Sequence, residues 1–206
     1  EAYGADTLRT YVLFMGDYGA ATPWSDNSVK GCKRFLERVA GFTDLLSEDP
    51  ETQKLETAFH RAIKKVSSDI EDMKFNTAIA CLMSLTNDIY NLGKISKEQL
   101  QIFIELLCPF APHLCEEIWE FTGGEGFLSQ HAWPQYDESK TVEAQTEIGV
   151  QVNGKVRGKV VIPTGAEKEE VFAIAKADSR IASLLEGKTM VKEVYVPNRL
   201  VNFVVK

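Results

Sequence analysis

The segment from Val150 to Pro163, V-Q-V-N-G-K-V-R-G-K-V-V-I-P, combines a turn signal with closely spaced cations. Asn153-Gly154 favours a two-residue β-hairpin turn, because both residue types tolerate the positive φ of a type I′ turn. Side chains alternate between the faces of a strand, so Lys155, Arg157 and Lys159 are predicted to share one face at steps of about 6.6 Å. That step is comparable to the phosphate spacing of a nucleic-acid strand, so the row could neutralise successive phosphates.

The other face of this predicted strand is apolar and carries Val156, Val160 and Ile162. Between Ile148 and Ala166 the sequence has no aspartate or glutamate that would neutralise the three cations. The alternative interpretation is a solvated outer face of a small sheet, because short charged stripes are common on protein surfaces.

A second group of cations lies on one side of a helix predicted over residues 26–47, at about 100° of rotation per residue. Its members are Lys30, Lys33, Arg34 and Arg38. The apolar positions of the same helix fall on the opposite side; they are Phe35, Val39, Phe42 and Leu46. The pattern fits a solvated face, and it also fits a face that contacts an RNA backbone through the fork-shaped donors of arginine.

Other chemistry finds little support in the sequence. Cys108, His113, Cys115 and Glu116 lie close together, but the spacing C-x4-H-x-C matches no standard zinc pattern, and two prolines interrupt it. We therefore expect a packed helix kink there and no metal. No glycine-rich phosphate loop, nucleophile elbow or HExxH motif appears in the sequence, so no catalytic residues are predicted. The three tryptophans are interpreted as core or docking residues, with base-stacking platforms as the alternative; they are Trp24, Trp119 and Trp133.

Charge is distributed unevenly along the 206 residues, whose net charge is −7. Residues 1–140 carry a net charge of −9 and residues 141–206 a net charge of +2. Any contact with a polyanion should therefore be local, and the C-terminal part is the better candidate. The four cysteines are interpreted as buried free thiols of a reducing compartment. With neither a signal peptide nor a long apolar run, a cytoplasmic location is expected. The first residue is not Met, so the chain is expected to be a piece of a longer protein.

Helical periodicity extends from about residue 5 to residue 122, with amphipathic segments at 26–47, 52–73 and 74–91. A further helix opens at Ser96 with a capping-box pattern, and Pro109 and Pro112 predict a break before it resumes. Residues 135–145 are interpreted as a loop and linker. After the hairpin we expect two short helices and a second strand pair. The predicted fold is multidomain, with a helical bundle over 1–134 and a small α+β domain over 146–206.

Several of these segments together resemble leucyl-tRNA synthetases, which are class I aminoacyl-tRNA synthetases. The run from Tyr3 to Arg9 resembles the sequence just after their KMSKS loop, and the runs 73–80 and 106–119 resemble shared helices of the class. The segment 24–26, then Gly31 and the segment 34–39, fit the same family. The tail, 150–163 and 194–202, resembles the C-terminal domain of the bacterial type. One departure is Gly16-Asp17-Tyr18-Gly19, where the family usually has a proline-bearing stretch.

The resemblance implies a tRNA-binding portion, with a helical anticodon-binding domain followed by a C-terminal domain that reaches the corner of the tRNA. The parent enzyme attaches leucine to tRNA(Leu) through an adenylate made from ATP, with Mg. Its catalytic and editing domains lie upstream. The chain alone is therefore expected to be inactive, to hold no cofactor, and to act as part of a cytoplasmic monomer that binds no membrane.

The resemblance also suggests which cations contact the tRNA. Arg34 and Arg38 match family arginines on the tRNA-facing helix. The tRNA-contacting residues expected from the patterns and the resemblance are Lys30, Arg34, Arg38, Lys155, Arg157 and Lys159. A helical protein-interaction module with a tethered small domain is the alternative, which the acidic helical half favours. Salt dependence of tRNA binding would discriminate between the two, because phosphate contacts release counterions.

Overall fold

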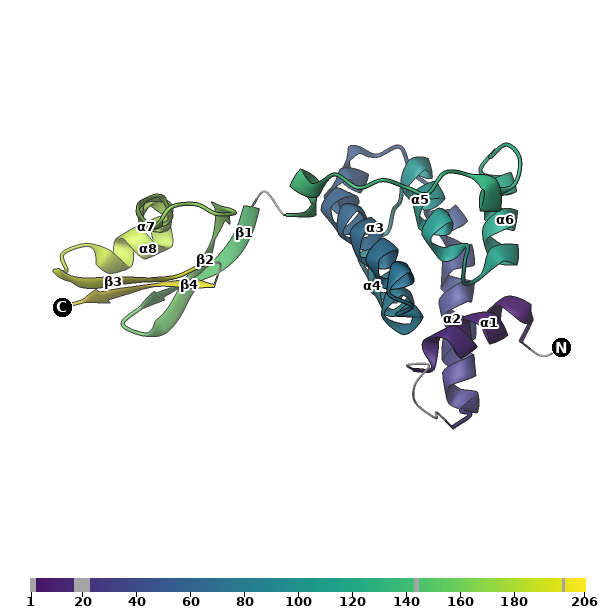
Figure 1. Cartoon of the computed structure of the whole chain (residues 1–206). Coiled ribbons are helices and arrows are strands. Elements are labelled where there is room, and N and C mark those ends of the chain that lie inside the picture. Colours follow the sequence, from purple (N-terminus) through teal and green to yellow (C-terminus); the bar gives the residue numbers. More distant parts are fainter. Residues whose placement is uncertain (1–2, 17–22, 143–144, 198) are drawn as a thin grey trace. The chain divides into compact units, whose positions relative to one another are not determined.

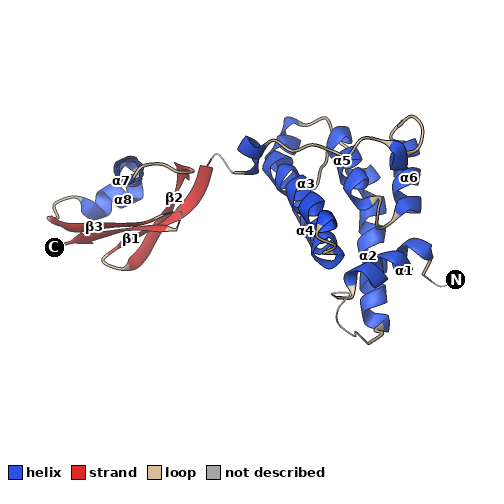
Figure 2. Ribbon diagram, in the orientation of Figure 1, coloured by secondary structure: helices blue, strands red, loops and turns tan. Residues whose placement is uncertain are grey.

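The computed structural model describes residues 3–16, 23–142, 145–197 and 199–206. The chain divides into two compact units, unit 1 over Glu1–Thr141 and unit 2 over Val142–Lys206. Figure 2 shows helices in unit 1 and the four strands in unit 2. A helical bundle followed by a small α+β domain was the fold class predicted from the sequence, and it is confirmed. Residues 17–19 of the departure from the family pattern, 143–144 of the expected linker, and Asn198 lie outside the described residues.

Within its described residues, unit 1 contains six α-helices (Figure 1). They are α1 (Ala5–Phe14), α2 (Asp26–Ala40), α3 (Glu56–Glu71), α4 (Phe75–Leu92), α5 (Lys97–Leu107) and α6 (Pro112–Phe121). Two 3-10 turns, η1 (Gly41–Leu45) and η2 (Pro50–Leu55), connect α2 to α3. The apolar stripes of these helices meet in one core whose largest fully buried members include Phe42, Ile79, Leu82, Ile89, Phe103 and Phe110.

The helix ends follow local signals in the sequence. Ser96 begins α5 with the predicted capping box: its hydroxyl accepts from the Gln99 N–H, and the Gln99 side chain accepts from the Ser96 N–H. Pro112 opens α6 as its first residue, so the predicted break separates two helices. At the end of α6, Gly123 has a φ of 74° and the Gly124 N–H bonds to the Trp119 carbonyl. This pair of glycines therefore closes α6 with a Schellman-type turn.

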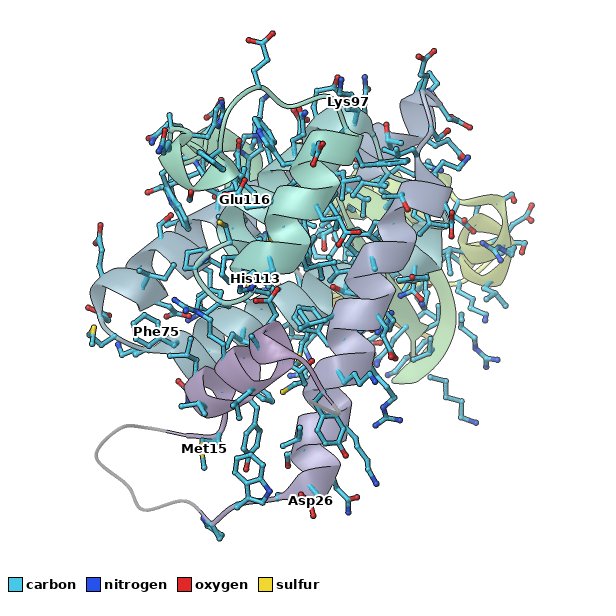
Figure 3. All side chains as sticks on the ribbon, turned by 90° about the vertical axis from the view of Figure 1, so that its right-hand side faces the viewer. Met15, Asp26, Phe75, Lys97, His113 and Glu116 are labelled. Carbon is cyan, nitrogen blue, oxygen red and sulfur yellow. The ribbon has the colours of Figure 1, made fainter. Side chains whose placement is uncertain are left out.

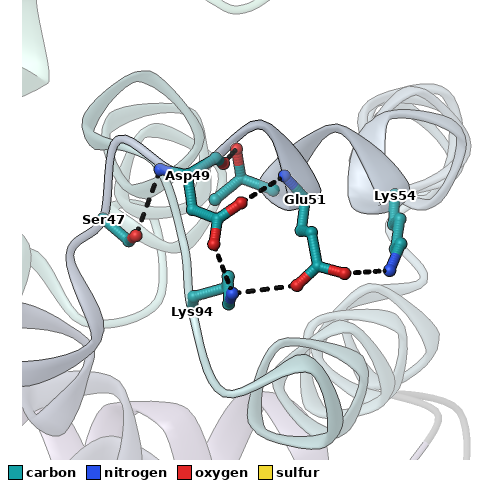
Figure 4. Close-up of polar contacts among 6 residues, drawn as sticks. Ser47, Asp49, Glu51, Lys54 and Lys94 are labelled. Carbon is teal, nitrogen blue, oxygen red and sulfur yellow. Dashed lines mark hydrogen bonds and ion pairs between the residues drawn. The ribbon is translucent and has the colours of Figure 1, made fainter.

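A cluster of charged side chains ties η2 to the turn between α4 and α5 (Figure 4). The Lys94 ammonium lies 2.7 Å from Asp49 Oδ2 and 2.9 Å from Glu51 Oε2. The hydrogen bond to Lys94 lowers the pKa of Asp49, and bonds to Lys54 and then Lys94 lower the pKa of Glu51. Both carboxylates therefore stay ionised well below neutral pH and hold the two connections together.

The segment after α6 returns across α3, and it includes the first part of the loop and linker predicted over residues 135–145. The η4 turn (Glu138–Thr141) pairs with α3 through Glu138 and Lys64, and through Lys140 and Glu56. The Asp137 N–H also donates to His60 Nδ1, at 3.1 Å. These contacts place residues 137–141 in unit 1, and the boundary between the compact units falls between residues 141 and 142.

Unit 2 is a four-stranded sheet with two helices on one face (Figure 1). Its elements are β1 (Gln145–Val152), β2 (Lys155–Pro163), α7 (Lys168–Ala177), α8 (Ser179–Leu185), β3 (Met190–Val196) and β4 (Leu200–Val205). The two predicted hairpins, β1–β2 and β3–β4, join through parallel pairing of β1 with β4, which gives the order β2-β1-β4-β3. Apolar side chains on the helix-covered face form the core around Val150, Val201 and Phe203.

The hairpin turn has the predicted geometry, with φ of 51° at Asn153 and 76° at Gly154. The Asn153 side chain also accepts from the Val205 N–H and donates to the Val205 carbonyl. The turn therefore serves two purposes, because the same residue reverses the chain and extends the pairing with β4.

Among the helices of the described residues, none has the length and apolar character needed to cross a membrane.

Candidate nucleic-acid interface

Helix α2 presents the first group of predicted cations. Ser25 caps the helix by accepting from the Ser28 N–H, which fixes where the helical rotation starts. The apolar positions of α2, including Phe35 and Val39, are buried in unit 1. Lys30 and Arg34 are exposed, and Arg38 is half-buried. A rise of about 1.5 Å per residue places these three cations about 6 Å apart along the helix axis.

A groove of about 490 Å³ runs beside this face, between α2, the end of α1 and α4. Its lining includes Ser28 and Gly31 from α2, Phe14 from α1, and Met83 and Asn87 from α4. Arg34 and Arg38 both line it, whereas Lys30 does not. The groove therefore brings two of the predicted cations together on one concave surface.

Arg38 is held in place by α4, which the sequence pattern did not indicate. Its guanidinium carbon lies 4.6 Å from the centre of the Tyr90 ring, and its Nη1 donates to Asn87 Oδ1 at 2.8 Å. The Tyr90 hydroxyl in turn donates to the Arg38 carbonyl. The bond to Asn87 uses one of the five guanidinium N–H donors, so Arg38 is fixed in orientation while keeping donor capacity.

Lys33 differs from the other cations of α2. Its ammonium lies 3.9 Å from Glu37 Oε1 one turn along the helix and 5.9 Å from the centre of the Tyr3 ring. Sequence spacing grouped Lys33 with Lys30 and Arg34 on one side of the helix. The structure distinguishes Lys33 from both by its acidic neighbour, and Lys33, like Lys30, does not line the groove.

The second group, on the β1–β2 hairpin, does not form the predicted row. A β-bulge interrupts the pairing, because Val150 opposes Gly158 while Gln151 opposes Val156, which leaves Arg157 as the extra residue. One extra residue exchanges the faces of everything beyond it. Lys155 consequently pairs with Val152, on the face of the core residue Val150, whereas Lys159 pairs with Gly149 on the opposite face.

The prediction that Lys155, Arg157 and Lys159 share one face is therefore wrong. The bulge also moves Val156 off the apolar face, and this side chain is 65% exposed. All three cations remain exposed, so they are available to solvent from different directions. No pattern within the strand signals the bulge except Gly158 itself, since glycine inside a strand often accompanies one.

Lys159 also has an acidic partner across the sheet. Its ammonium lies 2.7 Å from Glu147 Oε2 on β1. Glu147 lies one residue before the acid-free segment from Ile148 to Ala166, and the pairing of β1 with β2 brings it beside Lys159. For Lys155 and Arg157, none of the carboxylates in the described part of the chain lies within ion-pair distance.

The cysteine and histidine cluster at the start of α6 is a packing feature. The Asp6 carboxylate of α1 lies 2.8 Å from His113 Nδ1 and accepts from the Leu114 N–H. Glu116 accepts from the N–H groups of Leu128 and Ser129. Within the residues that the structure describes, no group of His, Cys, Asp and Glu side chains is arranged to hold a metal ion.

All four cysteines carry free thiols. Three are buried, as predicted, and Cys81 is half-buried. Burial raises the pKa of each of these thiols, so they stay protonated and unreactive at neutral pH.

The tryptophans divide into different environments. Trp119 is buried, and Trp133 donates its indole N–H to Ser67 on α3. Trp24, just before α2, is 58% exposed, so a core role is wrong for it and a docking role stays a prediction. Its position before an N-cap residue was visible in the sequence, but its exposure was not.

Comparison with known proteins shows the family to which the chain belongs. A family model described as the anticodon-binding domain of tRNA ligase matches residues 52–172. The leucine–tRNA ligase of Alkaliphilus oremlandii (strain OhILAs) is 45% identical over 205 residues, which cover 99% of this chain and 26% of that protein. The leucine–tRNA ligase of Herpetosiphon aurantiacus is 39% identical, with the same coverage. The chain thus spans about a quarter of the length of the curated relatives that it matches.

A solved structure shows the same fold over the whole chain. It is the crystal structure of the ternary complex of Agrobacterium radiobacter K84 agnB2 LeuRS with tRNA and LeuAMS, at a TM-score of 0.71 and 30% sequence identity. The match covers 100% of this chain and 29% of that one. Since the family model also matches more than half of the residues, the chain belongs to the family of anticodon-binding domains of tRNA ligases.

Proposed function

We propose that this chain is the tRNA-binding portion of a leucine–tRNA ligase, which joins L-leucine to tRNA(Leu) with ATP during protein synthesis. The observation that carries the proposal is the similarity to leucine–tRNA ligases over 99% of the chain, which spans both units. Leucine activation and editing, with ATP and Mg, belong to the rest of such an enzyme. The chain itself contributes RNA contacts to a cytoplasmic, monomeric ligase.

The geometry of α2 supports this role. Lys30 and Arg34 are exposed along one helix, and Arg34 and Arg38 border a groove. Cations at steps of about 6 Å suit successive phosphates, and such contacts set the position of the RNA without reading its sequence. Unit 1 is acidic overall, so binding depends on this local arrangement of charge.

We expect that replacing Lys30 and Arg34 together by alanine weakens binding of a tRNA(Leu) transcript to the intact chain. The dependence of log K on log salt should become shallower by nearly one unit for each phosphate contact that is lost. Fluorescence anisotropy between 50 and 200 mM salt measures both quantities. The matched control is Lys33→Ala on the same helix, which should leave the slope almost unchanged because Lys33 lies beside Glu37.

Two outcomes would contradict the proposal. If the wild-type chain bound tRNA(Leu) with no salt dependence, the proposed phosphate contacts would be ruled out. A wild-type chain that binds no tRNA would favour the alternative, a protein-interaction module with a tethered small domain.

The hairpin of unit 2 gives a separate prediction, which the β-bulge modifies. Replacing Lys155 and Arg157 by alanine should weaken tRNA binding and lower the salt slope by up to about two units, because neither side chain is paired with a described carboxylate. Lys159→Ala should change the slope less, because its ammonium already pairs with Glu147. Equal effects from Lys159→Ala and Lys155→Ala would show that the pairing with Glu147 does not persist in solution.

A further inference from the structure

Trp24 combines exposure with a fixed orientation. More than half of its surface is accessible, yet its indole N–H donates to Asp26 Oδ1 at 2.9 Å. Its ring also meets the ring of Tyr11 edge-on, with centroids 4.8 Å apart. Tyr11 is itself buried and accepts a hydrogen bond from the Ser25 N–H. The indole is therefore held from two sides while much of it faces solvent.

This arrangement is unusual for a tryptophan that only stabilises the fold. A core tryptophan buries its ring, as Trp119 does. At Trp24 the polar end of the side chain is already satisfied by Asp26, so what remains exposed is apolar ring surface. An exposed and immobilised aromatic surface is suited to a partner that is flat and aromatic, because little conformational freedom is lost on contact.

The position of Trp24 relates it to the cations of α2. Trp24 precedes the N-cap residue Ser25, whose hydroxyl bonds to Ser28, and Ser28 lines the groove that Arg34 and Arg38 also line. Figure 3 shows Asp26, the partner of the indole, at the start of α2. Along α2 the order is therefore a fixed aromatic ring, then the exposed cations Lys30 and Arg34.

We propose that Trp24 stacks on an unpaired nucleobase of the RNA whose phosphates lie along Lys30 and Arg34. This rests on the proposed tRNA-binding function and extends it by assigning a base contact next to the phosphate contacts. The phosphate contacts set the position of the RNA strand along α2, and the Trp24 ring stacks on one base where this row of contacts ends. The exposed cations Lys30 and Arg34 on the same helix favour RNA over an apolar protein segment as the partner.

Stacking and ion pairing can be separated by their salt dependence. Replacing Trp24 by leucine in the intact chain should weaken binding of a tRNA(Leu) transcript by about 5- to 150-fold, the range for the loss of one base–aromatic stack. The slope of log K against log salt should stay that of the wild type, because no phosphate contact is lost. Trp24→Phe should retain part of the affinity. The matched control is Trp133→Phe, another partly exposed tryptophan with a bonded indole N–H, which should bind as the wild type does.

A second measurement needs no destabilising substitution. Adding tRNA(Leu) to the wild-type chain should quench tryptophan fluorescence and protect one tryptophan from acrylamide, and Trp24→Phe should abolish that protected component. Circular dichroism melting of each variant separates loss of binding from loss of folding.

The outcomes distinguish the two proposals. If the wild type binds tRNA but Trp24→Leu binds equally well, or if Trp24 stays open to acrylamide in the complex, the stacking role is overturned and the tRNA-binding function stands. If the wild type binds no tRNA, both are overturned. If Trp24 is protected from acrylamide in a longer leucine–tRNA ligase without RNA, another part of the protein covers it, and the stacking role is overturned.

Discussion

Replacing Phe203 by alanine is expected to unfold unit 2 and leave unit 1 intact. Phe203 lies on β4, which pairs with β1 and β3. Its side chain is fully buried in the core of unit 2, and its ring lies 5.9 Å from that of Phe172 on α7. Truncation of a buried phenylalanine costs about 3–5 kcal/mol. The whole stability of a domain as small as Val142–Lys206 is roughly 3–10 kcal/mol. The variant should therefore lose most or all of its folded unit 2.

The three tryptophans make this test selective, because all of them lie in unit 1. In urea, the midpoint of the tryptophan fluorescence transition should match that of the wild type, while the amide NMR signals of the strands collapse to unfolded positions. Val156→Ala is the control within the same sheet, and as an exposed change it should cost under about 0.5 kcal/mol. A fluorescence midpoint that falls together with the loss of unit 2 would show that the two units fold as one.

Replacing Gly124 by alanine is expected to destabilise unit 1 by about 1–3 kcal/mol, the usual cost of overpacking. An added Cβ would lie 2.1 Å from Trp119 Cε2 and 2.2 Å from Trp119 Cδ2. The indole of Trp119 has little room to retreat, because it is 6% exposed and lies against the ring of His131. Either the ring or the turn that closes α6 must therefore move.

Urea unfolding followed by tryptophan fluorescence measures this effect directly. Gly31→Ala makes the same chemical change inside α2, where an added Cβ meets no atom within 4 Å. It should stabilise the helix by about 0.5–1 kcal/mol, because alanine replaces glycine in a helix interior. If the Gly124→Ala chain is as stable as the wild type, the turn after α6 rearranges at little cost in free energy and the predicted destabilisation is wrong.

Local features of unit 1 could be predicted from the sequence because neighbouring residues determine them. The stripe of Phe59, Ile63 and Val66 gave α3, and Ser96 with Gln99 gave the start of α5. Pro109 and Pro112 separated α5 from α6, since proline cannot continue a helix in its interior. Each of these signals acts within about one or two turns of chain, so no knowledge of the packing was needed.

The candidate site was predictable only in part. The sequence placed Lys30 and Arg34 on the outer side of α2, because rotation along a helix is regular. It did not reveal that Arg38 stacks on Tyr90, since that contact joins residues 52 positions apart. It also left Trp24 as a core or docking candidate, because an indole is apolar and only the packing around α1 and α2 decides whether it is covered.

The sequence by itself determined where the chain turns and which elements form, as the positive φ of Asn153 and Gly154 shows. Tertiary structure alone decided how the strands pair, and with that the arrangement of the hairpin cations. Parallel pairing of β1 with β4 and the bulge at Arg157 are set by contacts between distant segments. Because strand side chains alternate with a period of two, one extra residue moved Lys155 and Lys159 to opposite faces, which no local pattern could fix.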